Sequence, residues 1–317
     1  MLAVGIDIGG TKIAGGLVDD AGEILHKTRV DTPRRVADIE AAVADMISHL
    51  SEGRHVDVAG VAAAGFIDRE RSTVYFAPNI AWRDEPLRAR LEERTGMDVA
   101  IENDANAAGW AEYRFGSGRG MSDVVMLTLG TGVGGAVVTD GELYRGGHGI
   151  GGELGHMRVV PGGRECGCGQ RGCLETYGSG RALQREAVQI ADQHPDDLGA
   201  GLAAARAERG KLSGPMISRL VLADDAGAVE ALRRVAVAVG DACGSFSAIL
   251  DPQAFVIGGG VSQLGERLLA PMREAYAAAM PGLGSRPIAD FHIARLTNDA
   301  GVIGVADLAR RGRTGRA

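Results

Sequence analysis

The chain has 317 residues, of which 45% are hydrophobic and only 4% aromatic, and its formal net charge is −7. This length allows two domains with substantial cores, and a core of Ala, Val, Leu and Ile suits packed α/β layers. The acidic balance disfavours a general surface for nucleic acid or anionic membrane, so any phosphate binding must be local. The first apolar run starts too near Met1 for a signal peptide, and the most apolar segment, 124–138, is too short to span a bilayer. We therefore expect a cytoplasmic protein.

The N-terminal part of the chain alternates between strand and helix patterns. The predicted strands and helices are a strand at 3–8, strands at 12–18 and 24–30, a helix at 36–51, strands at 56–63 and 99–102, and a helix at 104–115. The glycine-rich segment 116–120 follows and is the best candidate for a linker.

The rest of the chain repeats the opening strands and then inserts a glycine- and cysteine-rich segment at 146–173. The later predictions are helices near 178–192, 199–208 and 228–249, a strand at 254–257 and a helix from about 262. Two rounds of mixed strands and helices predict two α/β domains, 1–118 and 119–317, with a cleft between them. The last helix can pack back on the first domain, and the arginine-rich tail 310–317 is expected to be a frayed end.

Two glycine-rich segments share one pattern. Val4–Lys12 reads VGIDIGGTK, Val125–Gly135 reads VMLTLGTGVGG, and each continues into a second apolar run. A strand–turn–strand unit with Gly and Thr at its tip exposes backbone N–H groups and a hydroxyl, which together can hold phosphate oxygens. Two such turns predict two related halves that bind one polyphosphate. The candidate residues are Gly9, Gly10, Thr11, Lys12, Thr131 and Gly132.

Three other interpretations of these turns compete with that one. The second turn fits a dinucleotide fingerprint, but a strand pattern follows it where a helix should. The first turn matches a P-loop only with its Lys and Thr reversed. A hairpin without a ligand is also possible. Asp7 argues against the hairpin, because an acid within an apolar strand needs a partner such as a hydrated cation.

A cluster of acids and amides spans Glu102–Asn106, where a predicted strand meets a predicted helix. The simplest explanation is a helix N-cap. In a chain with two phosphate-binding turns, however, phosphoryl transfer needs a carboxylate that orients the attacking hydroxyl and accepts its proton. Asp104 is the predicted base, held ionised by the helix dipole, and Asn103 is the neighbouring hydrogen-bonding group.

Three of the four cysteines, Cys166, Cys168 and Cys173, lie within eight residues and follow His156. Three thiolates and one imidazole complete a tetrahedral zinc shell, so the ion would be structural, although free thiols remain an alternative. Glu153 and Glu175 flank the cluster and are either surface acids or ligands of a polyol. Cys243, in an apolar helical run, is expected to be a buried filler.

Three further glycines follow the strand at 254–257, and two turns are weaker candidates. Gly258, Gly259 and Gly260 lie between a strand and a predicted helix, which fits close backbone approach to a nucleoside. The turns around Gly65 and Asn79 could be ordinary turns.

These motifs, in this order, resemble the ROK family of sugar kinases, named for repressor, open reading frame and kinase. The resemblance extends from DIGGTK at Asp7 to IGGGV at Ile257. Its most specific parts are ENDANAA at Glu102, ELGH at Glu153 and CGCGQRGCLE at Cys166. Within the family, the chain is most similar to the ATP-dependent glucokinases of high-GC Gram-positive bacteria. The resemblance implies a duplicated two-domain α/β fold of the actin-like, hexokinase-like (ribonuclease H-like) class.

The resemblance also implies roles for the matching residues. Asp104 would be the base for the 6-hydroxyl of glucose, and Asp7 would contact Mg²⁺ through water. His156 would bind Zn²⁺ through one ring nitrogen and face the sugar with the other. The residues near glucose would be Gly65, Asn79, Asn103, Glu153, His156 and Glu175. Those near ATP would be Gly9, Gly10, Thr11, Lys12, Thr131, Gly132 and Gly258–Gly260.

Other functions remain open at this point. The sugar could instead be fructose, N-acetylglucosamine or N-acetylmannosamine, and polyphosphate could replace ATP. A sugar-responsive ROK transcriptional regulator is disfavoured, because the first phosphate turn starts at residue 7 and leaves no DNA-reading domain before it. We expect a homo-oligomer, either a dimer or a tetramer.

Overall fold

The computed structural model describes residues 1–77, 80–282 and 284–314, and its residues cluster into two compact units. The first unit contains Met1–Ser122, Ala136–Gly152 and Arg295–Ala317. The second contains Asp123–Gly135 and Glu153–Ala294. The chain therefore passes more than once from one unit to the other.

A five-stranded sheet with the order β3-β2-β1-β4-β8 forms the centre of the first unit. The first three strands are antiparallel, whereas β1, β4 and β8 run parallel. The strands are β1 (Leu2–Ile8), β2 (Lys12–Val18), β3 (Ile24–Asp31), β4 (Val56–Ala63) and β8 (Asp98–Asn103).

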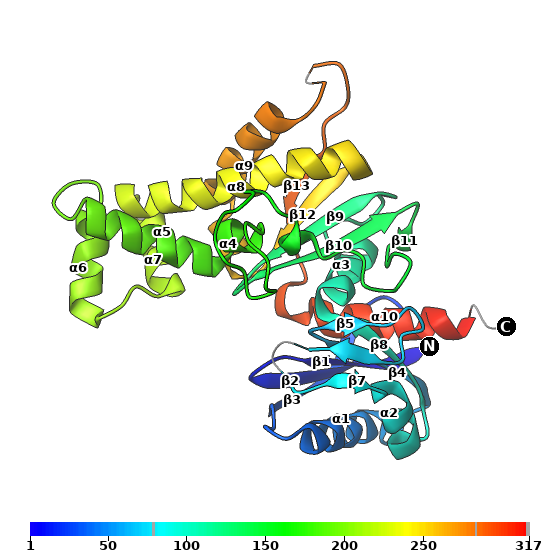
Figure 1. Ribbon diagram of the computed structural model, residues 1–317. Coiled ribbons are helices and arrows are strands. Elements are labelled where there is room, and N and C mark those ends of the chain that lie inside the picture. The colour runs from blue at the N-terminus through cyan, green and yellow to red at the C-terminus, as the bar shows by residue number, and fades with distance from the viewer. Residues whose placement is uncertain (78–79, 283, 315–317) are drawn as a thin grey trace. The chain divides into compact units, whose positions relative to one another are not determined.

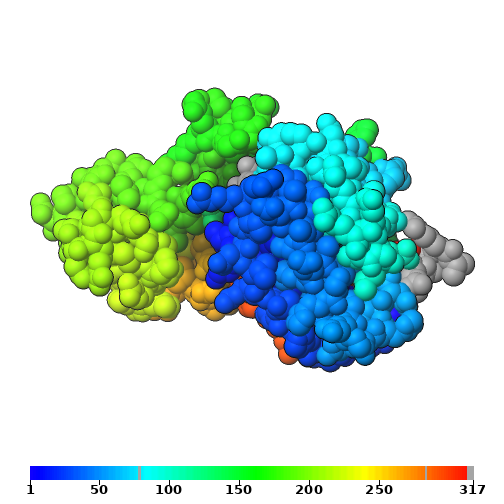
Figure 2. All heavy atoms as spheres, turned by 90° about the horizontal axis from the view of Figure 1, so that it is seen from below, coloured from blue at the N-terminus to red at the C-terminus, as the bar shows by residue number. Residues whose placement is uncertain are grey.

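Helices cover both faces of this sheet (Figure 1). The helices α1 (Val36–Ser51) and α2 (Leu87–Thr95) pack on one face, and α3 (Asp104–Phe115) and α10 (Ala300–Thr314) pack on the other. The buried side of α1 carries Ile39, Val43 and Ile47, at the spacing of successive helical turns. Figure 2 views the molecule from below, so that the face with α1 and α2 is turned toward the reader.

A small three-stranded sheet, β5-β6-β7, also belongs to the first unit. Its strands are β5 (Phe66–Ile67), β6 (Val74–Phe76) and β7 (Arg83–Glu85). They are too short for an alternating pattern to show in the sequence, and none was predicted.

The second five-stranded sheet has the order β11-β10-β9-β12-β13. Its strands are β9 (Val124–Leu129), β10 (Val133–Thr139), β11 (Glu142–Leu143), β12 (Ala254–Gly258) and β13 (Asp290–Ile293). The strand β12 runs parallel to β9 and β13, and β10 runs antiparallel to β11. Each sheet thus continues from antiparallel strands at one edge into three parallel strands. The duplication predicted from the two glycine turns and the α/β fold class predicted from the alternating strands and helices are confirmed.

Most helices of the second unit lie between the two halves of its sheet in the sequence. They are α4 (Glu175–Gly178), α5 (Gly180–Gln193), α6 (Ala200–Arg209), α7 (Gly214–Leu222), α8 (Ala226–Leu250) and α9 (Glu266–Ala279). The long helix α8 packs along α9 and also contacts α5 and α7 (Figure 1). Cys243 is fully buried within α8, as expected for an apolar filler.

The predicted helix from about 262 is wrong in detail. A 3-10 helix occupies Gly260–Leu264, and α9 begins only at Glu266. Gly265 separates them with φ 57° and ψ −129°, a conformation that an α-helix cannot contain. Within the described ranges, no helix combines the length and apolar character needed to cross a membrane.

Candidate functional site

The junction of β8 and α3 holds the predicted base. Asn103 is the N-cap of α3: its Oδ1 accepts hydrogen bonds from the backbone N–H of Ala105 (2.9 Å) and of Asn106 (3.1 Å). Its Nδ2 donates to the carbonyl of Gly65 at 3.1 Å. Asn103 therefore performs the capping role that was the simpler explanation for this cluster, and Asp104 is the first residue of the helix.

Asp104 lies close enough to Asp7 to affect its ionisation. Asp7 lies near the end of β1, and Asp104 directly follows β8. These two strands are parallel, and β4 lies between them in the sheet. Burial, and secondarily the charge of Asp104, raise the pKa of Asp7 to about 7. Burial also raises the pKa of Asp104, although its carboxylate accepts a hydrogen bond from the N–H of Ala105. Desolvation therefore raises this pKa by more than the hydrogen bond at the helix start lowers it.

The first glycine turn is short and closed. The N–H of Gly9 donates to the carbonyl of Lys12 at 2.9 Å, and Thr32 Oγ1 donates to the carbonyl of Gly9 at 2.7 Å. Gly10, Thr11 and Lys12 are exposed at the tip. The tip residues of the turn thus face solvent, while the hydrogen bond from Thr32 holds its base.

The second glycine turn is held by residues that come later in the chain. The N–H of Gly130 donates to the carbonyl of Gly132 at 3.0 Å, and the N–H of Gly180 donates to the carbonyl of Gly130 at 2.7 Å. Thr131 is exposed at its tip. A phosphate-binding role for both turns is thus compatible with their geometry.

Glu175 contacts this second turn. Its Oε2 accepts a hydrogen bond from the N–H of Val133 at 3.2 Å, and its Oε1 lies 3.6 Å from the sulfur of Cys166. A side chain on Gly132 would collide with the same carboxylate. Glu175 therefore connects the cysteine cluster to the second glycine turn.

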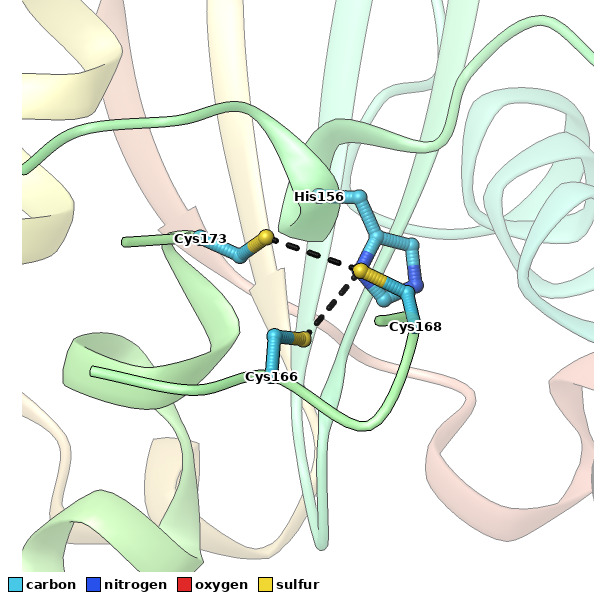
Figure 3. A group of neighbouring side chains, drawn as sticks. All are labelled: His156, Cys166, Cys168 and Cys173. Carbon is cyan, nitrogen blue, oxygen red and sulfur yellow. Dashed lines mark hydrogen bonds between the residues drawn. The ribbon is translucent and has the colours of Figure 1, made fainter. Parts of the chain in front are cut away.

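The cysteine cluster is a candidate metal centre. The ligand atoms of His156, Cys166, Cys168 and Cys173 all lie within 4.8 Å of one another, and their side chains converge in Figure 3. The Sγ atoms of Cys168 and Cys173 are 3.7 Å apart, as are Cys166 Sγ and His156 Nδ1. A tetrahedron with Zn–S bonds of about 2.3 Å has sulfur–sulfur edges of about 3.8 Å. The four residues therefore fit a closed zinc site.

The local fold explains why His156 points into this cluster. His156 ends the short 3-10 helix Leu154–His156, in which Gly155 lies against the carbonyl of Val133 so closely that no side chain would fit. Nδ1 faces Cys166, and Nε2 lies 4.0 Å from Glu153 Oε2. One ring nitrogen is thus available for a metal and the other faces an acid. Burial raises the pKa of the Cys166 thiol to about 12, so metal binding there would release a proton.

The three glycines after β12 differ in their surroundings. Gly259 has φ 84° and lies against the backbone of Leu129, at the end of β9, so a side chain there would collide. Gly258 packs against the side chain of Met126, whereas Gly260 has no neighbour within 4 Å of a built Cβ. Gly260 is therefore the open position of the three.

The predicted site residues are divided between the units. The first unit contains Asp7, Gly9, Gly10, Thr11, Lys12, Gly65, Asn103 and Asp104, and the second contains Thr131, Gly132, Glu153, His156, Glu175, Gly258, Gly259, Gly260 and the three clustered cysteines. Asn79 lies outside the described residues. The sequence interpretation missed Thr32, Arg71 and Arg145. No motif marks them, because their roles depend on contacts with residues distant in the chain.

The model of the ROK family matches residues 3–312. A glucokinase of Streptomyces coelicolor is 44% identical over 309 residues, covering 98% of each chain, and an N-acetylmannosamine kinase of Haemophilus influenzae is 33% identical, covering 96% of this chain and 94% of its own. The crystal structure of a ROK family glucokinase from Streptomyces griseus in complex with glucose and AMPPNP superposes with a TM-score of 0.87 at 45% identity, covering 98% of this chain and 100% of that one.

Proposed function

The chain belongs to the ROK family, and from this premise we propose that it is an ATP-dependent glucokinase. It transfers the γ-phosphoryl group of ATP to the 6-hydroxyl of glucose and yields glucose 6-phosphate and ADP. We propose glucose and not N-acetylmannosamine as the acceptor. The two glucokinases compared above are 44–45% identical to this chain, whereas the N-acetylmannosamine kinase is only 33% identical. The fold is the actin-like, hexokinase-like duplicated fold.

The observation that carries this proposal is the pair of acids Asp7 and Asp104 at the ends of parallel strands. Phosphoryl transfer needs one carboxylate to accept the proton of the attacking hydroxyl and negative charge to hold the cation that accompanies ATP. Asp104 accepts the 6-hydroxyl proton while that oxygen bonds to the γ-phosphorus and the bond to the β–γ bridging oxygen breaks. Its raised pKa suits a base that must take up a proton.

Mg²⁺ fits beside Asp7. This carboxylate is largely desolvated and has a pKa raised to about 7, so a cation would offset the cost of its ionisation. When bound, Mg²⁺ neutralises charge on the ATP phosphates. Asp7 would hold it through water, and Gly9–Lys12 with Thr131 and Gly132 would bind the phosphates themselves. Gly258–Gly260 would line the adenosine side.

Glucose would be held by amide, carboxylate and imidazole groups. Asn103 and the backbone of Gly65 are already joined by a hydrogen bond, and Asn103 is the residue next to the base. Glu153 and Glu175 supply carboxylates that can each bridge adjacent sugar hydroxyls, and His156 supplies one ring nitrogen for a single hydroxyl. Asn79 would complete the set.

Zn²⁺ would be bound by Cys166, Cys168, Cys173 and His156 Nδ1. The closed donor set leaves no position for substrate, so the ion would stabilise the loop and not take part in the reaction. By fixing the imidazole through Nδ1, it would orient the other nitrogen of His156 toward the sugar.

One assay tests the proposed function. Purified protein is offered glucose, fructose, mannose, N-acetylglucosamine and N-acetylmannosamine, each with ATP or with polyphosphate. We expect kcat/KM to be highest for glucose with ATP. A higher value for any other sugar or for polyphosphate would reassign the substrate, and no turnover with any pair would contradict a kinase.

A further inference from the structure

The inference concerns a buried ionic cluster that lies beside the proposed base and that no motif indicates. Glu102 is fully buried at the end of β8 and lies between two arginines. Arg71 Nε donates to Glu102 Oε2 at 2.8 Å, and Arg145 Nε lies 2.9 Å from the same oxygen. We call these three residues the Arg71–Glu102–Arg145 triad. All three belong to the first unit.

The side chain of Glu102 is hydrogen-bonded to the start of α3. Its Oε1 accepts hydrogen bonds from the N–H of Asn103 at 2.9 Å and from Nδ2 of Asn106 at 3.1 Å. These two residues flank Asp104, which occupies the intervening first turn of the helix. The orientation of the Glu102 carboxylate therefore constrains the backbone from which Asp104 projects.

Arg145 connects this carboxylate to the chain near Gly65. Its two terminal nitrogens donate to the carbonyls of Arg69 (2.8 Å) and Asp68 (2.9 Å), while its Nε contacts Glu102. The side chain is only 9% exposed. A guanidinium group can make all of these contacts at once because it is planar and carries five N–H donors, whereas an ammonium group cannot.

Arg71 approaches Glu102 from a turn with unusual geometry. Its φ is 56°, in the left-handed region that residues other than glycine rarely adopt. The turn is held by the carboxylate of Asp68, which accepts hydrogen bonds from the N–H groups of Ser72 (2.6 Å) and Thr73 (3.0 Å). Such conformations persist where surrounding contacts over-determine them, often next to functional sites.

We propose that the Arg71–Glu102–Arg145 triad is a positioning device for phosphoryl transfer: it sets the place and direction of the Asp104 carboxylate, with Arg145 as its central positioning residue. None of the three touches the reacting atoms. The inference rests on the proposed function, in which Asp104 is the base.

A competing explanation is that the triad only stabilises the fold. A second buried arginine of the same unit provides the control for that explanation. Arg310, in α10, donates to the backbone carbonyls of Val18 (2.9 Å) and Asp19 (2.6 Å) and pairs with Asp307 at 3.2 Å. It has the same chemistry as Arg145 and similar burial, but it contacts no proposed site residue.

The experiment compares Arg145→Ala, Arg145→Lys and Arg71→Ala with Arg310→Ala. For each protein the folded fraction is measured by circular dichroism, and kcat and the glucose KM are expressed per folded molecule. Loss of Arg145 should lower kcat about 100-fold, as expected for a misplaced catalytic group, with a smaller change in KM. Arg145→Lys should recover only part of the loss. Arg310→Ala should lower the melting temperature but leave kcat per folded molecule within about threefold of wild type.

Chemical rescue separates positioning from folding. Guanidinium chloride at low, non-denaturing concentration should restore activity to Arg145→Ala, because the ion can occupy the vacated site, and should not restore it to Arg310→Ala. Wild-type kcat in Arg145→Ala, an equal loss in Arg310→Ala, or absence of rescue would each overturn the proposal. If Arg145→Ala does not fold, Arg71→Ala replaces it in the comparison, because the side chain of Arg71 is partly exposed. A wild-type kcat in Arg71→Ala would then overturn the proposal.

Failure of this proposal can be told apart from failure of the proposed function. A wild-type protein that phosphorylates no hexose refutes the function itself. An active wild type beside an equally active Arg145→Ala refutes only the positioning role.

Discussion

At the scale of single residues, burial determines how the proposed catalytic acids behave. Asp7 lies near the end of a strand that is otherwise apolar, and Asp104 follows a strand within a cluster of acids and amides. The structure adds that they influence each other and that desolvation raises the pKa of both. Shifted pKa values of buried, neighbouring carboxyl groups are typical of functional sites.

The exchange Asp104→Asn tests the base directly. The amide keeps the size and the hydrogen bond to Ala105 but cannot accept a proton, so kcat should fall by a factor of at least about 100, within the range for general bases. Glucose affinity, measured by isothermal titration calorimetry, should change little. Retention of more than about a tenth of kcat, roughly 1.4 kcal/mol of barrier, would exclude Asp104 as the base.

The exchange Asp7→Asn tests the buried acid through stability. Because the pKa of Asp7 is about 7 in the folded protein and about 3.8 in the unfolded chain, the folded state holds the proton more tightly, and stability falls as the pH rises through this window. Without divalent cations, Asp7→Asn should raise the melting temperature by a few degrees at pH 8, about 1 kcal/mol, and by less at pH 5. Turnover should be lost.

Asp20→Asn is the matched control for this experiment, because Asp20 is 81% exposed in the neighbouring hairpin turn. Its melting temperature should follow wild type at both pH values. A stabilisation of Asp7→Asn that is equal at pH 5 and pH 8 would contradict a raised pKa.

At the scale of elements, the segment 153–175 joins two features that the sequence shows separately. The cysteine cluster and the second glycine turn are linked by Glu175, which accepts from Val133, and by Gly155, which packs against the same residue. The segment 153–175 therefore carries the proposed sugar ligands and also contacts the second glycine turn.

Metal content tests the cysteine cluster. Wild-type protein should contain about one zinc per chain by elemental analysis, and Cys168→Ser should lose the metal and unfold at a lower temperature, because a ligand of the closed site is missing. Cys243→Ala is the control, since this cysteine is buried in α8 and should leave the zinc content unchanged. Wild-type protein purified without stoichiometric zinc would exclude the site.

Nucleotide affinity tests the link through Glu175. Glu175→Ala removes the acceptor for the N–H of Val133 and should weaken AMPPNP binding about 10-fold, since a hydrogen bond to a charged group is worth about 1.5–3 kcal/mol. Glu165→Ala, in the same loop, is the control, because this residue is 82% exposed and pairs only with Arg171 in the structure as described. If Glu175→Ala alters glucose binding and leaves AMPPNP binding unchanged, the link has no role on the nucleotide side.

At the scale of the whole molecule, residues from the two ends of the chain pack against each other in the first unit. Helix α10 packs on β1 and β4, and Gly5 and Gly60 in these strands allow that close approach. A side chain at Gly304 would lie 1.8 Å from the carbonyl of Ala107 in α3. The first unit is therefore complete only when the C-terminal residues have been added.

Two glycines of α10 offer a matched test of this packing. Gly304→Ala should destabilise the protein by about 1–3 kcal/mol, because it overpacks the contact between α10 and α3. Gly312→Ala, in the same helix but with open space around it, should be neutral or stabilising by about 0.5–1 kcal/mol. Denaturant unfolding curves measure both, and equal effects of the two exchanges would contradict the packing argument.

Much of the architecture can be read from local patterns. The bounds of α1 and α3 agree with the predicted 36–51 and 104–115, because apolar spacing and the Asn103 cap mark them. The duplication follows from the two glycine turns. The segment after Gly260 was misjudged because a 3-10 helix and an α-helix share nearly the same apolar spacing over a few residues, and only the backbone at Gly265 separates them.

The sequence by itself determined the duplicated α/β fold and indicated the candidate base Asp104 and the candidate metal ligands, because each of these patterns is made by residues that are close together in the chain. Only the tertiary structure revealed the Arg71–Glu102–Arg145 triad, the contact of Glu175 with Val133 and the raised pKa of Asp7. Arg145 and Glu102 are 43 residues apart, and no local spacing relates them. Contacts and burial of this kind arise when separate elements pack, so chain order alone does not contain them.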